Sequence, residues 1–185
     1  MRARGEAPQR LPRDRADRLL APATSTCPGC GLELPRTGGQ THPYIGASAE
    51  CWGQYGELLA LDYGELDMPD FHRLTVDTYA AQHPGEPGRR AEQSVAVHLA
   101  GLYLVLEREA DPDYVHRLFP TLTEKERPFG WLEPPPGLGT VTVADVLDAS
   151  CHEEYGARVR DWAMNVWAAW EPHQATIRAW LDEER

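Results

Sequence analysis

The sequence predicts an all-α protein, on three observations. From residue 48 onward, apolar residues recur at helical spacing through most of the chain. The strict alternation of apolar and polar residues that is typical of half-buried strands is almost absent. Ahead of the helical region, residues 22–47 are rich in Gly, Pro and Thr and contain a C-x2-C pair at Cys27 and Cys30. The fold class expected is therefore an irregular helical bundle with an N-terminal zinc-knuckle loop.

Length and composition favour one domain with a sizeable core, because the chain has 185 residues of which 42% are hydrophobic. Residues 1–22 are rich in Arg and lack the apolar segment of a secretory signal, so we expect a disordered or loosely docked tail. Residues 23–185 are expected to form a single helical metal-binding domain.

The first helices follow from capping and proline signals. Ser48 can cap a helix that runs to about Asp62. A second helix opens at Pro69 and must end before Pro84, because proline disfavours the α conformation in the residue before it. The strongest apolar helix is predicted over residues 91–108.

The C-terminal half continues with a shorter helical segment over 112–119 and a proline-rich loop over 120–141. Capping-box patterns begin at Thr142 and Ser150, and the second of them opens a long helix. Pro172 suits the first turn of a last helix.

Charge and cysteine content restrict the class of function. The formal net charge is -11, from 18 basic and 29 acidic residues, which argues against a nucleic-acid ligand. No stretch reaches the roughly 18–20 apolar residues that a membrane span needs. Four cysteines without a signal peptide favour a cytosolic location, where a C-x2-C pair is more often metal-binding or redox-active than a structural disulfide.

Three cysteines and a histidine follow the pattern C-x2-C-x11-H-x8-C, formed by Cys27, Cys30, His42 and Cys51. Three thiolates and one imidazole are a tetrahedral zinc donor set, so the sequence predicts a zinc ion here. Four filled positions would make the site structural, whereas three with an open position would make it catalytic. The spacing favours the closed, structural site.

Alternatives to this donor set remain. The pair Cys27–Cys30 could be a dithiol redox motif, although the residues after Cys30 make a poor helix start. Cys51 could be a buried apolar cysteine, but its expected place in a first helical turn favours the thiolate. His72, His83 or His98 could replace His42 as the fourth ligand.

A second group of polar residues is more suggestive of catalysis. His72, Tyr79 and His83 share one face of the second predicted helix, and Asp77 lies on an adjacent strip. His98 falls on the buried side of the following helix. These residues are either a hydrogen-bonded core cluster, or a catalytic pair or second metal site formed by His83 and His98 with Asp77 behind one of them.

Several motifs together resemble those of an uncharacterised bacterial family of small proteins. They are Cys27-Pro28-Gly29-Cys30-Gly31, His42-Pro43-Tyr44, Cys51-Trp52, Asp77-Thr78-Tyr79-Ala80-Ala81-Gln82-His83-Pro84-Gly85, Val97-His98-Leu99 and the Trp-rich C-terminal region. The resemblance extends from Cys27 to Leu181. It implies a one-domain, metal-binding protein and no particular activity.

The function expected is therefore a small cytosolic zinc-binding protein with a separate His/Asp/Tyr pocket. That pocket would suit a metal-assisted or acid/base enzyme that acts on a small molecule. The alternative is a zinc-stabilised interaction or regulatory module without catalysis, which would bind a protein partner through its acidic surface and the proline-rich loop at 133–137.

Overall fold

A computed structural model describes residues 23–64, 69–111, 129–182 and residues 114, 115, 117, 118 and 120. The tail predicted over 1–22 and part of the segment predicted over 112–119 lie outside the described residues. The part described contains two short strands, six α-helices and one 3-10 turn. They are β1 (Thr24–Thr26), β2 (Glu33–Pro35), α2 (Ala49–Tyr63), α3 (Pro69–Gln82), α4 (Arg89–Leu106), α6 (Val143–Leu147), α7 (His152–Ala169), η1 (Glu171–His173) and α8 (Gln174–Asp182). The predicted all-α class is confirmed.

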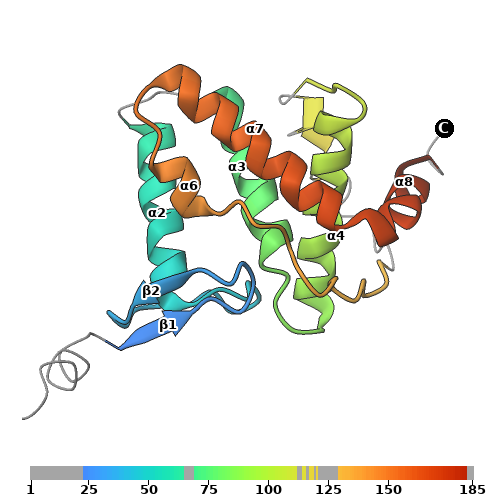
Figure 1. Cartoon of the computed structure of the whole chain (residues 1–185). Helices are drawn as coiled ribbons and strands as arrows, with labels where there is room; N and C mark the ends of the chain where they lie inside the picture. The colour runs from blue at the N-terminus through green and yellow to red at the C-terminus, as the bar shows by residue number, and fades with distance from the viewer. Residues whose placement is uncertain are drawn as a thin grey trace, which may run out of the picture.

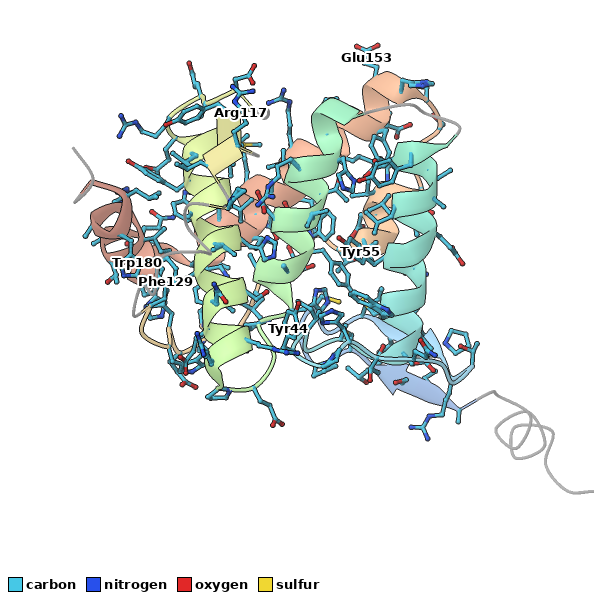
Figure 2. All side chains as sticks on the ribbon, turned by 180° about the vertical axis from the view of Figure 1, so that it is seen from behind. Tyr44, Tyr55, Arg117, Phe129, Glu153 and Trp180 are labelled. Atoms are coloured by element: carbon cyan, nitrogen blue, oxygen red, sulfur yellow. The ribbon has the colours of Figure 1, made fainter. Side chains whose placement is uncertain are left out.

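Helices α2, α3 and α4 stand side by side, and α7 crosses one face of this layer (Figure 1). The view from behind places α7 on the far side of the three helices (Figure 2). Helix α7 buries Tyr155, Val159, Trp162 and Val166, which recur at helical spacing along one stripe. No helix in the described ranges is both long and apolar enough to cross a membrane.

The N-terminal knuckle is a small hairpin at the foot of α2 (Figure 1). Strands β1 and β2 pair antiparallel, with Ser25 opposite Leu34, and the turn between them carries Cys27 and Cys30. The sequence predicts only a loop here, because three-residue strands are too short to show alternation. Gly31 leaves this turn with a φ of 75°, in the left-handed region that favours glycine.

The observed helix starts agree closely with those predicted from capping residues. Ser48 caps α2 by accepting a hydrogen bond from the backbone N of Cys51 at 3.1 Å. The capping box predicted at Thr142 is present at the start of α6. At Ser150 the carboxylate partner is Glu154 rather than Glu153. Helix α7 accordingly begins at His152, slightly later than the sequence pattern indicated.

Gln82, at the C-terminal end of α3, ties three parts of the fold together. Its side chain is fully buried, and its Nε2 donates to the carbonyl oxygens of Leu138 and Val141 at 3.1 and 2.8 Å. Its Oε1 accepts a hydrogen bond from Trp162 Nε1 of α7 at 2.9 Å. The irregular segment before α6 is thereby fastened to α3 and α7.

Gln82→Ala is expected to destabilise the protein by about 2–3 kcal/mol, because it leaves buried groups of Leu138, Val141 and Trp162 without partners. Urea denaturation followed by circular dichroism measures this change. Gln54→Ala is the matched control, since the side-chain oxygen of Gln54 has no hydrogen-bond partner. Equal losses in the two variants would contradict the role given to Gln82.

Candidate functional site

Four donor atoms meet where the knuckle, α2 and the end of α3 come together. The donor atoms of Cys27, Cys30, Cys51 and His83 all lie within 4.8 Å of one another. Cys30 Sγ and Cys51 Sγ are 3.8 Å apart, too far for a disulfide, and Cys51 Sγ lies 3.5 Å from His83 Nε2. Three of the four residues are buried and Cys30 is half-buried. The cluster therefore fits a metal ion held by protein ligands alone.

Each of these donors is positioned by a local feature of the chain. Cys27 and Cys30 lie in the hairpin turn, and Cys51 lies in the first turn of α2 behind the Ser48 cap. His83 directly follows α3, and its Nδ1 donates to the carbonyl oxygen of Tyr79 at 2.7 Å. That hydrogen bond places the proton on Nδ1 and leaves Nε2 as the nitrogen that faces the sulfurs.

Gly29 allows the hairpin turn to approach the end of α3. A Cβ at this position would lie 2.4 Å from His83 Cδ2 and 2.6 Å from the carbonyl oxygen of Gln82. Because neither backbone nor buried imidazole can yield that much space, the Pro28-Gly29 sequence between the cysteines is required by contact with α3.

The buried sulfurs of the cluster strongly influence one another's ionisation. Contacts with Cys30 and Cys51 hold the pKa of the Cys27 thiol well below its ordinary value. Contacts with Cys27 and Cys30 raise the pKa of the Cys51 thiol. Three crowded sulfurs cannot all ionise in a buried site without a compensating positive charge. A metal dication would supply that charge.

His42 does not join this cluster, although the sequence spacing placed it there. Its ring lies between Tyr44 and Trp52, with centroid distances of 4.2 and 5.0 Å. His42 Nδ1 is buried without a hydrogen-bond partner, and burial lowers the pKa of this imidazole. The fourth position belongs to His83, because the end of α3 passes over the hairpin turn whereas the loop carries His42 away from it.

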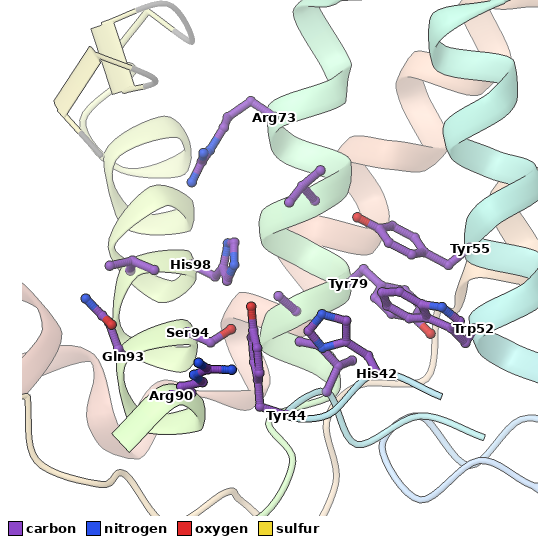
Figure 3. A pocket seen from close by; sticks show the side chains of 14 residues that line it. His42, Tyr44, Trp52, Tyr55, Arg73, Tyr79, Arg90, Gln93, Ser94 and His98 are labelled. Carbon is purple, nitrogen blue, oxygen red and sulfur yellow. The ribbon is translucent and has the colours of Figure 1, made fainter. Parts of the chain in front are cut away.

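A pocket of about 550 Å³ opens beside the metal cluster, on the face of α3 opposite α7 (Figure 3). Helix α2 contributes Trp52 and Tyr55, and the loop before α2 contributes His42 and Tyr44 (Figure 3). The side chains from α3 and α4 are Arg73, Val76, Tyr79, Ala80, Arg90, Gln93, Ser94, Val97 and His98, and Ile45 completes the lining. The volume suits a small molecule.

Asp77 organises the polar wall of this pocket from behind. Its side chain is fully buried and accepts two hydrogen bonds from Arg73, at 2.9 and 2.6 Å. It also accepts one from His98 Nδ1 at 2.7 Å. The arginine compensates the buried carboxylate charge, and the hydrogen bond to Nδ1 makes Nε2 the basic nitrogen of His98.

Space for the Asp77 carboxylate comes from Gly101 of α4. A Cβ at Gly101 would lie 2.1 Å from Asp77 Oδ2 and 2.7 Å from its Cγ. Helices α3 and α4 can therefore enclose the carboxylate between them only because residue 101 has no side chain.

Of the other predicted site residues, Tyr79 lies between the metal cluster and the pocket. Its ring stacks on Tyr55 at 3.8 Å and on His83 at 4.1 Å, and its hydroxyl donates to Cys51 Sγ at 3.5 Å. It thus connects the Cys3His cluster to a pocket wall. Burial raises the pKa of the Tyr79 hydroxyl, which keeps the phenol protonated as a donor.

His72 lies outside both sites. Its Nδ1 is 3.4 Å from Asp62 Oδ2, and its Nε2 is 2.6 Å from the hydroxyl of Tyr63. Asp62 also accepts a hydrogen bond from the Tyr155 hydroxyl, and burial raises the pKa of this carboxyl. This group forms a satisfied polar cluster between α2, α3 and α7.

The proline-rich loop lies beside the knuckle and forms a groove with it. Pro134, Pro135 and Pro136 line a groove of about 430 Å³ together with Pro28 and Pro43. His173 Nε2 lies 2.8 Å from the carbonyl oxygen of Glu133, which holds one end of the loop.

Some residues in and around the pocket were not predicted as site residues from the sequence. Arg73 precedes Asp77 by four residues, which is the spacing of a helical ion pair and could have revealed it. Gly101 interrupts an otherwise apolar helix, a signal of close packing. Arg90 carries no comparable local signal, because only the tertiary fold brings it to the pocket.

Fold and site together define a helical protein with an N-terminal Cys3His cluster beside a pocket of small-molecule size. The chain belongs to the Family of unknown function (DUF5946), whose model matches residues 25–171. That range contains all four donors of the cluster and every residue that lines the pocket. No curated protein and no solved structure matches the chain.

Proposed function

We propose that the cluster binds zinc. A tetrahedral zinc ion with Zn–S bonds of about 2.3 Å places two sulfurs about 3.8 Å apart, and a Zn–N bond of about 2.0–2.1 Å gives a nitrogen–sulfur separation of about 3.5–3.6 Å. The separations of Cys30 Sγ from Cys51 Sγ, 3.8 Å, and of Cys51 Sγ from His83 Nε2, 3.5 Å, agree with these values.

The zinc would be structural, because four protein donors fill a tetrahedral shell and leave no position for substrate or water. It would join the hairpin to α2 and to the end of α3. The His42–Tyr44 segment lies between the hairpin and α2 in the chain, so the same ion would hold one wall of the pocket in place. Thiolate ligands suit a reducing compartment such as the cytosol.

The pocket would perform acid/base chemistry on a small molecule, with His98 as the base and Asp77 as the residue that orients it. The observation that carries this proposal is the 2.7 Å contact between His98 Nδ1 and a fully buried Asp77 at the wall of the pocket. An aspartate in this position holds the imidazole in one tautomer and stabilises the imidazolium that forms when Nε2 takes a proton.

His98→Gln is expected to abolish turnover and preserve the fold. Glutamine retains a side-chain donor toward Asp77 but has no basic nitrogen. The metal-loaded protein and the variant are incubated with a mixed metabolite extract, and mass spectrometry identifies compounds that only the native protein consumes. His152→Gln, the same change at an exposed histidine outside the pocket, is the control and should behave as the native protein.

Identical metabolite profiles for native protein and His98→Gln, with both folded and loaded with zinc, would contradict catalysis by His98. A compound consumed by the native protein and by His152→Gln, but not by His98→Gln, would support it and name the substrate.

A further inference from the structure

The pocket differs in charge from the rest of the molecule. The whole chain carries 29 acidic residues against 18 basic ones, yet the pocket lining contains two arginines and no aspartate or glutamate. The Asp77 carboxylate does not line the pocket. Its side chain is fully buried and is paired with Arg73 and His98. The wall therefore presents positive charge to the cavity.

Arg90 carries the positive charge that Asp77 does not balance, because Asp77 is paired with the other arginine of the lining, Arg73. Its side chain is exposed, and no hydrogen bond or ion pair holds it among the described residues. It is the second residue of α4, at the end of the helix where the dipole disfavours a cation. An anion bound at Arg90 would be favoured by the guanidinium and by the helix dipole together.

The opposite wall is aromatic. Trp52 lies 5.0 Å from His42 and 5.8 Å from Tyr79 by ring centroids, and Tyr44 lies 4.2 Å from His42. Figure 3 shows the Tyr44 ring between Arg90 and His42. Such ring faces favour a planar, apolar group over a flexible one. The hydroxyls of Tyr44 and Tyr55 have no hydrogen-bond partner among the described residues, so they can serve a ligand.

We infer that the pocket binds a planar aromatic compound that carries one carboxylate or phosphate group. The anionic group would pair with Arg90, and the ring would lie against Trp52 and Tyr44. This inference rests on the proposed function in that it takes the same pocket as the substrate site, and it adds the class of compound.

The test compares compounds that differ in one property. Isothermal titration calorimetry of the zinc-loaded full chain measures the Kd of 2-naphthoate, 2-naphthyl phosphate, the neutral 2-naphthamide and the non-planar decahydronaphthalene-2-carboxylate. We expect at least one naphthyl anion to bind tenfold or more tightly than either the amide or the non-planar acid.

Arg90→Gln is expected to weaken binding of the naphthyl anion about tenfold to a hundredfold, the effect of losing one charge-assisted hydrogen bond. Arg89→Gln is the matched control, because the same charge is removed from the adjacent exposed residue, which does not line the pocket. It should change the Kd less than twofold.

Equal binding of 2-naphthamide and the anions, equal effects of Arg89→Gln and Arg90→Gln, or no binding of either anion at millimolar concentration would each overturn the inference. These results are distinguishable from failure of the proposed function. If the protein turned over a neutral substrate and this turnover depended on His98, the acid/base function would be supported and the inference of an anionic substrate would be refuted. If a naphthyl anion bound in an Arg90-dependent manner but no compound were turned over, the inferred ligand class would be supported and the acid/base function would be refuted.

Discussion

Cys51→Ser is expected to abolish metal binding and cooperative folding. Cys51 is fully buried and contacts both Cys30 and His83, so its loss removes the central donor of the cluster. Structural zinc contributes on the order of 10–16 kcal/mol in small zinc-dependent folds, which is comparable to the whole stability of a typical domain, about 5–15 kcal/mol. Metal content by mass spectrometry and the thermal transition by circular dichroism measure the two losses.

Cys151→Ser provides the matched control. Cys151 is exposed and lies outside the cluster, so this variant should keep its metal and its transition temperature. If Cys51→Ser and Cys151→Ser had the same transition temperature, the cluster would have no structural role.

Gly101→Ala is expected to have the second-largest effect, a loss of about 3–5 kcal/mol in the free energy of unfolding. The added methyl group would overlap the fully buried Asp77 carboxylate, which would have to move away from its partners. Displacing Asp77 would also break its contacts with Arg73 and His98, and a broken buried ion pair costs several kcal/mol. Urea denaturation measures the stability, and the shift of the His98 ring signals in NMR reports the loss of its contact.

Gly56→Ala is the control for Gly101→Ala, because a Cβ at Gly56 of α2 meets nothing within 4 Å. Alanine has the higher helix propensity, so this variant should be as stable as the native protein or about 1 kcal/mol more stable. Equal stabilities of the two variants would refute the contact between Gly101 and Asp77.

Local signals in the sequence were sufficient for the helical part of the fold. The Ser48 cap, the Thr142 capping box and the proline after His83 each act within a few residues, and the structure shows all three where expected. The strands of the knuckle were not predictable, because a three-residue strand contains too little alternation and its pairing depends on the turn.

The candidate site was predicted in part. The three cysteines were predicted from their spacing, since only two residues separate Cys27 from Cys30 and Cys51 lies in the first turn of a capped helix. The choice between His42 and His83 depends on how α3 ends above the hairpin, which is a tertiary contact. Sequence distance favoured His42, whereas the hydrogen bond from His83 to Tyr79 and the absence of a side chain at Gly29 favour His83.

The residues of the second predicted cluster were distributed over three environments. His83 belongs to the Cys3His cluster, His98 and Asp77 form the pocket pair, and His72 contacts Asp62 at the other end of α3. A shared helical face shows which residues are neighbours along one helix. It does not show which element covers each of them, and the covering elements decide their roles.

X-ray absorption spectroscopy at the zinc edge of the purified full chain tests the central claim most directly. The first shell should contain three sulfurs at about 2.3 Å and one nitrogen at about 2.0–2.1 Å. His83→Ala should lose the nitrogen contribution, whereas His42→Ala should leave the spectrum unchanged. A shell with an oxygen ligand, or one that changes in His42→Ala and not in His83→Ala, would contradict the closed site formed by Cys27, Cys30, Cys51 and His83.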